Sequence, residues 1–212
     1  MMNVSAVNKY INASCIISKQ VVYKNTIKVF ENQEAAVPDF LSSVYRHFDI
    51  KYPKFYKMDN LSKLGWLAAE ILLKDSFIAG KYKSGDIGIV LTNTSSSLDT
   101  DIKYYETAKD IASPALFVYT LPNIVIGEIC IRHHLKGENA FFICDKFDGE
   151  FIEQYVTNLI NNNILQACIC GWVELLNDQY KAVLFLVEKE ISPGSIIFTI
   201  ENINKIYELE NG

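Results

Sequence analysis

The sequence has no long apolar run and no excess of positive charge, and each absence excludes a class of protein. Its longest apolar stretches, residues 140–144 and 182–187, are the size of a strand, whereas a membrane-spanning helix needs about 18 residues. Lys and Arg number 20 against 25 Asp and Glu, and the formal net charge of -5 offers little attraction to a phosphate backbone. We therefore expect neither a membrane span nor a nucleic-acid partner.

Cysteine is scarce and odd in number, which argues against a disulfide framework. The five cysteines are Cys15, Cys130, Cys144, Cys168 and Cys170. Most lie in apolar surroundings, and free thiols in a reducing compartment are the simplest interpretation. Residues 1–20 also lack the charged, apolar and small-residue segments of a secretory signal. We therefore expect a cytoplasmic protein.

The composition that remains is that of a globular chain. Half of the 212 residues are hydrophobic and 21% are charged. A chain of this length buries roughly 70% of its unfolded surface, so a core needs no metal or disulfide. No internal repeat and no linker divides the sequence. We therefore expect a single domain over residues 1–212.

Helical and strand patterns alternate along the chain. The apolar spacing predicts helices at residues 34–50, 59–77, 99–111, 122–135 and 151–161. It predicts strands or extended chain at residues 12–19, 85–92, 116–120, 140–144, 165–173, 181–188 and 195–200, and a hairpin arm or excursion at 24–31. Asp59 or Asn60 is the expected cap of the second helix, and Gly137 the expected C-cap of the fourth. This alternation favours the α/β class with a mostly parallel sheet.

Four motifs occur in an order that is familiar from one family. Met58-Asp59 precedes a long helix, and it is followed by GDIGIVLTNTSSSLDTDIKYYET, SPALFVYTLPNIVIGEICIRHHLKGE and LINNNILQACICGWVE. Together these segments, within residues 52–174, resemble the N-terminal half of the β-ketoacyl synthases, condensing enzymes of the thiolase-like fold. The last motif resembles the helix end and strand that lead to the family's Gly-Gly-x-Glu.

The resemblance implies a fold and a partner. It implies a thiolase-like, layered α/β fold with a mostly parallel mixed sheet of about five strands. The segment YKAVLFLVEKEISPGSIIFTI resembles paired strands that would extend this sheet at the C-terminal end. In the family, dimers pair through the strand that is residues 140–144 here, beside the helix from Asn123. The partner implied is a ketosynthase-type subunit or a second copy of the chain.

The family's catalytic cysteine has no clear counterpart. Such a cysteine carries the acyl chain as a thioester at a helix N-terminus, where the helix dipole favours the thiolate. Counting back without gaps from Glu174 puts Lys146 at that position, and an ammonium group cannot carry a thioester. Cys144, two residues earlier, is the one candidate nucleophile, and a buried structural cysteine is the alternative interpretation. The family's remaining catalytic groups come from a C-terminal half with no counterpart in this sequence.

These observations leave three functions open. The first is a non-catalytic, chain-length-factor-like subunit of a fatty-acid, polyketide or aryl-polyene-type biosynthetic system. The second is a trimmed acyltransferase or condensing enzyme that uses Cys144. The third is a module that binds an acyl chain or an acyl carrier protein. Because carrier proteins are acidic, the candidate docking residues are the clustered lysines Lys51, Lys54, Lys57 and Lys63.

No cofactor and no metal site is expected. His133 and His134 are adjacent, so a helix would point them about 100° apart, and a solvated helix end is the simpler interpretation. Cys168 and Cys170 have strand spacing, which places both thiols on one face of a sheet. Metal sites usually need a second pair of ligands. These two cysteines are therefore predicted to lie in the core.

Overall fold

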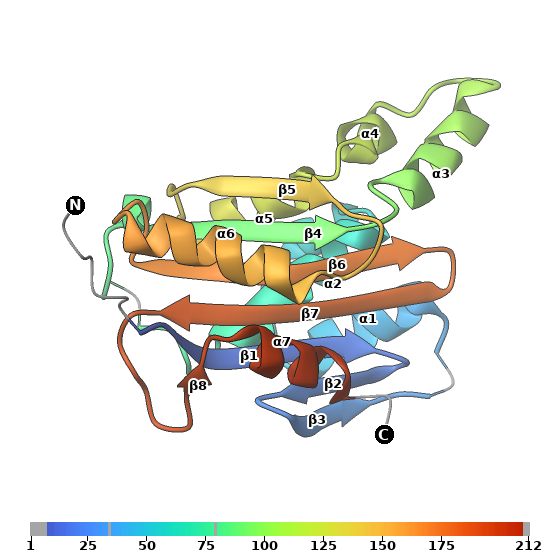
Figure 1. Cartoon of the computed structure of the whole chain (residues 1–212). Helices are drawn as coiled ribbons and strands as arrows, with labels where there is room; N and C mark the ends of the chain where they lie inside the picture. Colours follow the sequence, from blue (N-terminus) through green and yellow to red (C-terminus); the bar gives the residue numbers. More distant parts are fainter. Residues whose placement is uncertain (1–7, 34, 79, 210–212) are drawn as a thin grey trace.

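The computed structural model describes residues 8–33, 35–78 and 80–209, which form one mixed sheet with helices on both faces (Figure 1). The strands lie in the order β3-β2-β1-β7-β6-β4-β5, and β8 pairs with β1. Their bounds are β1 Tyr10–Ser18, β2 Val21–Lys24, β3 Ile27–Glu31, β4 Ile87–Asn93, β5 Asn139–Ile143, β6 Ala167–Leu176, β7 Gln179–Glu188 and β8 Ile196–Ile197.

The helices divide between the two faces of the sheet. They are α1 Val37–His47, α2 Asn60–Leu73, α3 Leu98–Ala108, α4 Pro114–Phe117, α5 Ile124–His133, α6 Gly149–Asn161 and α7 Ile200–Tyr207, with 3-10 turns η1 Pro53–Lys57, η2 Ser84–Asp86 and η3 Val118–Thr120. Side chains of α1, α2 and α5 share one hydrophobic core with the sheet, and those of α6 and α7 share the other. The α/β class expected from the sequence is confirmed.

The expectation of a mostly parallel sheet of about five strands is wrong. Only the pairs β4–β5 and β4–β6 are parallel, and the other strand pairs in this eight-stranded sheet are antiparallel. A parallel pair requires a long crossover, whereas a short turn can join only antiparallel strands. Tight turns with left-handed residues join β1 to β2, β2 to β3 and β6 to β7, at Gln20, Asn25 and Asn177.

Of the two strands expected to extend the sheet at the C-terminal end, residues 181–188 are present within β7, whereas residues 195–200 are reduced to the two residues of β8 before α7 begins. β2 and β3 extend the sheet further from the N-terminal side, and β3 lies where a hairpin arm or an excursion was predicted. Residues 116–120, predicted to be extended, are helical in α4 and η3. Ser113 explains this helix start, because its side chain accepts a hydrogen bond from Leu116 N and Pro114 follows it.

Two residues, Asp59 and Gly137, were predicted to cap helices. Asp59 caps α2 as expected, accepting a hydrogen bond from Ser62 N at 2.9 Å. Gly137 is not a helix cap: α5 ends at His133, and His134 adopts the left-handed conformation at its end. Gly137 instead packs against β4, where a Cβ atom would lie 2.4 Å from the Ile87 carbonyl oxygen. Close backbone packing, not helix termination, therefore requires this glycine.

Strand β5 lies at one edge of the sheet (Figure 1). Residues 140–144 were predicted to be a buried strand, but β5 is half-exposed, with Asn139 and Ile143 open to solvent.

No single helix among the described residues has the length and apolar character to cross a membrane. One bent pair, Pro114–Thr120 with Ile124–His133, meets the requirement by length and composition, with a 96° bend.

Gly171, in the middle of β6, gives a prediction for folding stability. Its φ is +146°, and a Cβ atom would lie 2.0 Å from the Val183 carbonyl oxygen on β7. We expect Gly171→Ala to lower the free energy of unfolding by about 2–4 kcal/mol, measured by urea denaturation. Gly85→Ala is the control, because nothing lies within 4 Å of the added carbon there. Equal midpoints for the two variants would contradict this account of the sheet.

Candidate functional site

The ends of three neighbouring strands bring the segments of interest together. β4 runs parallel to both β5 and β6, so residues after β4 and β5 meet at the same edge as the end of β6. Cys144 N donates to the Asn93 carbonyl at 2.8 Å, which continues the ladder by one residue. Glu174 Oε2 accepts hydrogen bonds from Thr94 N at 2.7 Å and Ser95 N at 3.2 Å. The Glu174 carboxylate thereby fixes the loop after β4 beside Cys144's strand.

Cys144 does not lie at a helix N-terminus, which is where the family's catalytic cysteine is held. β5 ends at Ile143, and α6 begins at Gly149 with Asp148 as its N-cap. The Asp148 carboxylate accepts a hydrogen bond from Phe151 N at 2.9 Å, so an anion already occupies the positive end of α6. The intervening segment, residues 144–148, is called the elbow below.

The electrostatics of the elbow disfavour a thiolate. Burial raises the pKa of the Cys144 thiol, and the carboxylates of Asp148 and Asp145 raise it further. An activated cysteine needs the opposite shift, because the thiolate is the nucleophile. Lys146, at the position the gapless count gives to the nucleophile, is exposed. The elbow therefore holds one thiol that is mainly protonated at neutral pH and one solvated ammonium group.

An aromatic cluster fills the space beside the elbow. The ring of Phe147 stacks on that of Tyr207, with centroids 3.7 Å apart and planes 3° apart. The same ring meets the edge of Trp172 at 6.0 Å. Trp172 stands where a Gly-Gly-x-Glu motif ending at Glu174 would have its second glycine. The cluster joins the elbow, β6 and the end of α7. Of its three aromatic residues, only Trp172 lies within one of the sequence motifs that carry the resemblance.

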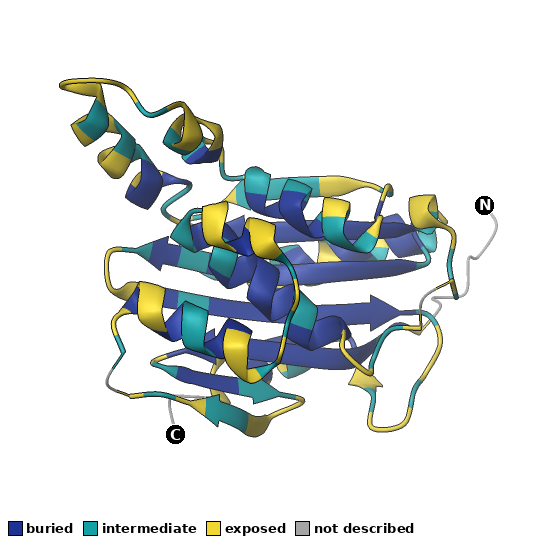
Figure 2. Cartoon of the chain, turned by 180° about the vertical axis from the view of Figure 1, so that it is seen from behind, coloured by how far each residue is buried: buried dark blue, intermediate teal, exposed yellow. Residues whose placement is uncertain are grey.

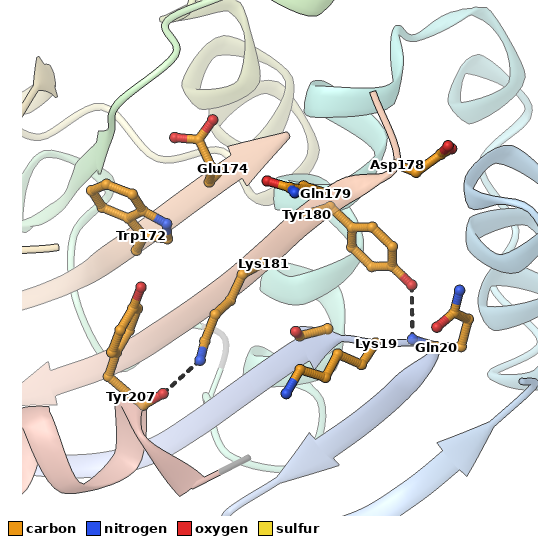
Figure 3. A pocket seen from close by; sticks show the side chains of 10 residues that line it. Lys19, Gln20, Trp172, Glu174, Asp178, Gln179, Tyr180, Lys181 and Tyr207 are labelled. Carbon is orange, nitrogen blue, oxygen red and sulfur yellow. Dashed lines mark hydrogen bonds between the residues drawn. The ribbon is translucent and has the colours of Figure 1, made fainter. Parts of the chain in front are cut away.

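A hollow of about 520 Å³ lies next to this cluster (Figure 3). It is lined by the β6–β7 hairpin, the β1–β2 turn and the end of α7, and Cys144 is not one of its lining residues. Lys181 Nζ donates to the Tyr207 carbonyl at 2.7 Å, and Gln20 N donates to the Tyr180 hydroxyl at 2.9 Å. In the described structure, the hollow and the candidate thiol are therefore separate features.

The four candidate docking lysines lie near one another on η1, the loop before it and the start of α2. Lys51 pairs with Asp49, and Lys54 Nζ lies 2.7 Å from Glu128 Oε2, a carboxylate whose side chain is only 5% exposed. Lys63 lies over the ring of Phe55, and burial lowers its pKa. Lys57 is exposed. Docking by these lysines stays a prediction, and two of them already take part in ion pairs.

His133 is not simply a solvated helix end. Its Nε2 lies 2.8 Å from Glu70 Oε1, and Arg132 binds the same carboxylate through Nε at 2.9 Å and Nη2 at 3.2 Å. This cluster joins α5 to α2. Cys168 and Cys170 are fully buried in one core cluster, as predicted. Within the described ranges, no group of three or more His, Cys, Asp or Glu residues is arranged to hold a metal ion.

The environment of Cys144 gives a prediction for its reactivity. Because the Asp145 charge raises the thiol's pKa, Asp145→Asn lowers it and increases the thiolate fraction at pH 7. We expect alkylation of Cys144 to become roughly twofold to threefold faster, measured by peptide mass spectrometry. Asp110→Asn, which removes a remote exposed carboxylate, should leave the rate unchanged. An unchanged rate in Asp145→Asn would show that the elbow is arranged differently in solution.

Comparison with known proteins identifies the fold of this chain. The sequence matches no protein-family model and no curated protein. Among solved structures, the ishigamide ketosynthase/chain length factor matches with a TM-score of 0.59 and 16% identity, over 85% of this chain and 62% of that one. A type II polyketide ketosynthase complex with its acyl-carrier protein matches with a TM-score of 0.60 and 14% identity, over 86% of this chain and 63% of that one.

A third structure is a complex of the ketosynthase ApeO with its chain length factor ApeC from Xenorhabdus doucetiae. It matches with a TM-score of 0.55 and 10% identity, over 88% of this chain and 80% of that one. The chain spans about three fifths of the length of the first two structures. At these identities the likeness concerns the fold. The chain has the thiolase-like fold of ketosynthases and chain length factors.

Proposed function

We propose that this chain is a non-catalytic, chain-length-factor-like subunit of a fatty-acid, polyketide or aryl-polyene-type biosynthetic system. The observation that carries the proposal is the composition of the elbow. A gapless count back from Glu174 puts Lys146 at the nucleophile position, and an ammonium group cannot hold a thioester. Cys144, the one thiol nearby, precedes α6 by several residues and lies among carboxylates that oppose its ionisation.

Two further features support the absence of acyl transfer. The N-terminus of α6, where a helix dipole could stabilise an anionic nucleophile, is capped by Asp148. The rings of Phe147, Trp172 and Tyr207 fill the space next to it. A trimmed acyltransferase that uses Cys144 would have to move the aspartate and the ring cluster. That alternative therefore ranks behind the non-catalytic subunit.

The proposed partner is a ketosynthase-type subunit or a second copy of this chain. The matched structures include a ketosynthase in complex with its chain length factor. In this chain, β5 forms the outer strand of the sheet on one side, and its five residues carry no charge. An uncharged edge strand exposes unpaired backbone groups that favour pairing with another strand. We infer that a partner covers this edge, and we place the assembly in the cytoplasm.

The proposal predicts that the chain does not accept an acyl group. After incubation with a short acyl-loaded carrier protein, the intact mass of the wild-type chain should show no gain. The Cys144→Ala variant should give the same result. A mass gain equal to the acyl group in the wild type, absent in Cys144→Ala, would replace the non-catalytic subunit with an acyltransferase.

A carrier-binding role is the second candidate, because exposed Lys57 lies in a basic stretch on η1. Carrier proteins are acidic, so Lys57→Glu should weaken binding by roughly threefold to tenfold at low salt, measured by calorimetry with the unloaded carrier. Lys205→Glu is the control, since Lys205 is an exposed lysine of α7 on the other face of the sheet. Equal affinities for both variants would remove this stretch as the docking site.

A further inference from the structure

A hollow of about 500 Å³ lies where the C-terminal ends of α1, α2 and α5 approach one another. These helices pack on the face of the sheet that is seen in Figure 2, whereas α6 and α7 pack on the face seen in Figure 1. Apolar side chains form one part of the wall, among them Phe48, Leu73 and Phe77, and acidic and basic side chains form the rest. A hollow of this size with such a mixed lining is typical of a small-molecule site.

Arg132, in the last turn of α5, is held in one position at this hollow. Its Nε and Nη2 donate to the two oxygens of Glu70 at 2.9 and 3.2 Å. Its guanidinium carbon lies 5.2 Å from the centre of the Tyr52 ring and 6.0 Å from that of Trp66. A guanidinium has five N–H donors, and Glu70 is its one hydrogen-bond partner among the described residues, so three donors remain. An anion that accepts from these donors meets a side chain that is already ordered.

The carboxylate of Glu70 neutralises only part of the positive charge at this site. Burial alone would raise its pKa, but the contacts with His133 and Arg132 hold the pKa below its ordinary value, so Glu70 is ionised at neutral pH. Its Oε1 lies 2.8 Å from His133 Nε2 and 2.9 Å from Arg132 Nε. One negative charge therefore serves two basic side chains.

Two lysines also line the hollow. Lys51 is paired with the Asp49 carboxylate. Lys74 follows the last residue of α2, with its ammonium group 5.6 Å from the centre of the Phe48 ring, and it forms no ion pair within the described ranges. With the histidine neutral, the lining has three positive and two negative charges, a net charge of +1. The whole chain has a formal net charge of -5, so this lining differs in sign from the rest of the molecule.

Helix dipoles account for part of this arrangement. The C-terminal end of a helix is partially negative, so basic side chains are stabilising there without any ligand. That explanation requires neither a hollow with apolar side chains in its wall nor a guanidinium with three open donors. An anion with an apolar body would satisfy both features.

We propose that this hollow binds a small free carboxylate with a compact apolar body. The planar, two-oxygen head accepts hydrogen bonds from the end of the Arg132 guanidinium, whose parallel N–H groups suit such a group. Lys74 supplies a second positive charge near the head. The apolar body packs against Phe48, Leu73 and Phe77, where it is removed from water.

This ligand and its position are separate from the chemistry considered for the elbow. An acyl group on a carrier protein is a thioester and has no carboxylate, so the ligand is a free acid. α5 ends at His133, shortly before β5 begins, whereas the elbow follows the last residue of β5. No lining residue of the hollow belongs to the elbow. The site can therefore be occupied whether or not Cys144 reacts.

Nitrogen-15 NMR of the full chain tests the site, with 3-phenylpropionate as the probe. The sequence has two arginines, Arg46 and Arg132, so at most two side-chain Nε–H signals are present. We expect the Arg132 signal to shift and saturate, with a dissociation constant of about 1 mM or tighter. Arg46 is exposed on α1 and does not line this hollow, so its signal is the internal control and should not shift.

Three variants separate ligand binding from the structural contact with Glu70. Lys74→Glu leaves that contact in place, reverses one charge, and should weaken binding roughly fivefold to tenfold. Lys205→Glu makes the same charge change on an exposed position of α7 and should bind within about twofold of the wild type. Arg132→Lys keeps the charge but loses the planar fork, and should weaken binding by about tenfold or more, measured through backbone amide signals.

Changes to the probe test the two parts of the ligand. 3-Phenylpropanol lacks the charge and acetate lacks the apolar body, and each should bind about tenfold more weakly or less than 3-phenylpropionate. Equal affinity for the alcohol would overturn the carboxylate, and equal affinity for acetate would overturn the apolar body. An Arg132 signal that does not shift, or a Lys74→Glu variant that binds as tightly as the wild type, would make the contact with Glu70 purely structural and overturn the site.

Discussion

The burial of α2 against the sheet is the contact on which the rest of the structure depends. Small residues, among them Gly65, let the helix approach its neighbours closely, and a Cβ atom on Gly65 would lie 2.5 Å from Val125 Cγ2 on α5. Trp66, Leu67 and Leu72 are fully buried, and each such side chain contributes roughly 1.5–3 kcal/mol to stability. Both ends of this helix then position other parts of the molecule.

At its start, Asp59 uses its two carboxylate oxygens for different tasks. Oδ1 caps α2 through Ser62 N, and Oδ2 accepts a hydrogen bond from the Thr100 hydroxyl in the first turn of α3. Near the end of α2, Glu70 binds Arg132 and His133 of α5. α5 precedes β5, so α2 helps to fix the orientation of α3 and of the strand that leads to the elbow. The position of the edge strand β5 therefore depends on the core.

The sequence predicted the elements whose patterns were strong and local. The apolar stripe and acidic cap of α2, and the apolar runs of β4, β6 and β7, gave elements near their predicted positions. Strand direction was not predictable in this way, because an apolar run reads the same in a parallel or an antiparallel pair. The β2–β3 hairpin was predicted only as one of two alternatives, a hairpin arm or an excursion at residues 24–31, because its turn residues, Asn25 and Thr26, lack the glycine that usually marks such a turn.

The site was predictable only in part. The resemblance brought out the elbow, with Cys144 and Lys146, because a gapless count back from Glu174 reaches these residues. It did not bring out the ring that stacks on Phe147, since Tyr207 follows more than fifty residues later and no local pattern connects the two. The Asp148 cap is visible in the sequence as an aspartate before a helix. Its consequence for the thiol depends on the exact start of α6, which a pattern does not give.

The stack of Phe147 on Tyr207 couples the elbow to the last helix of the described chain. Aromatic pairs of this kind contribute about 0.5–1.5 kcal/mol beyond the area that they bury. A ligand that entered at the elbow would have to separate the two rings, so its binding would be thermodynamically linked to detachment of the end of α7. Its apparent affinity would then be the intrinsic affinity reduced by the free energy of that opening. Occupancy of the elbow and order in α7 are, in this sense, competing states of one equilibrium.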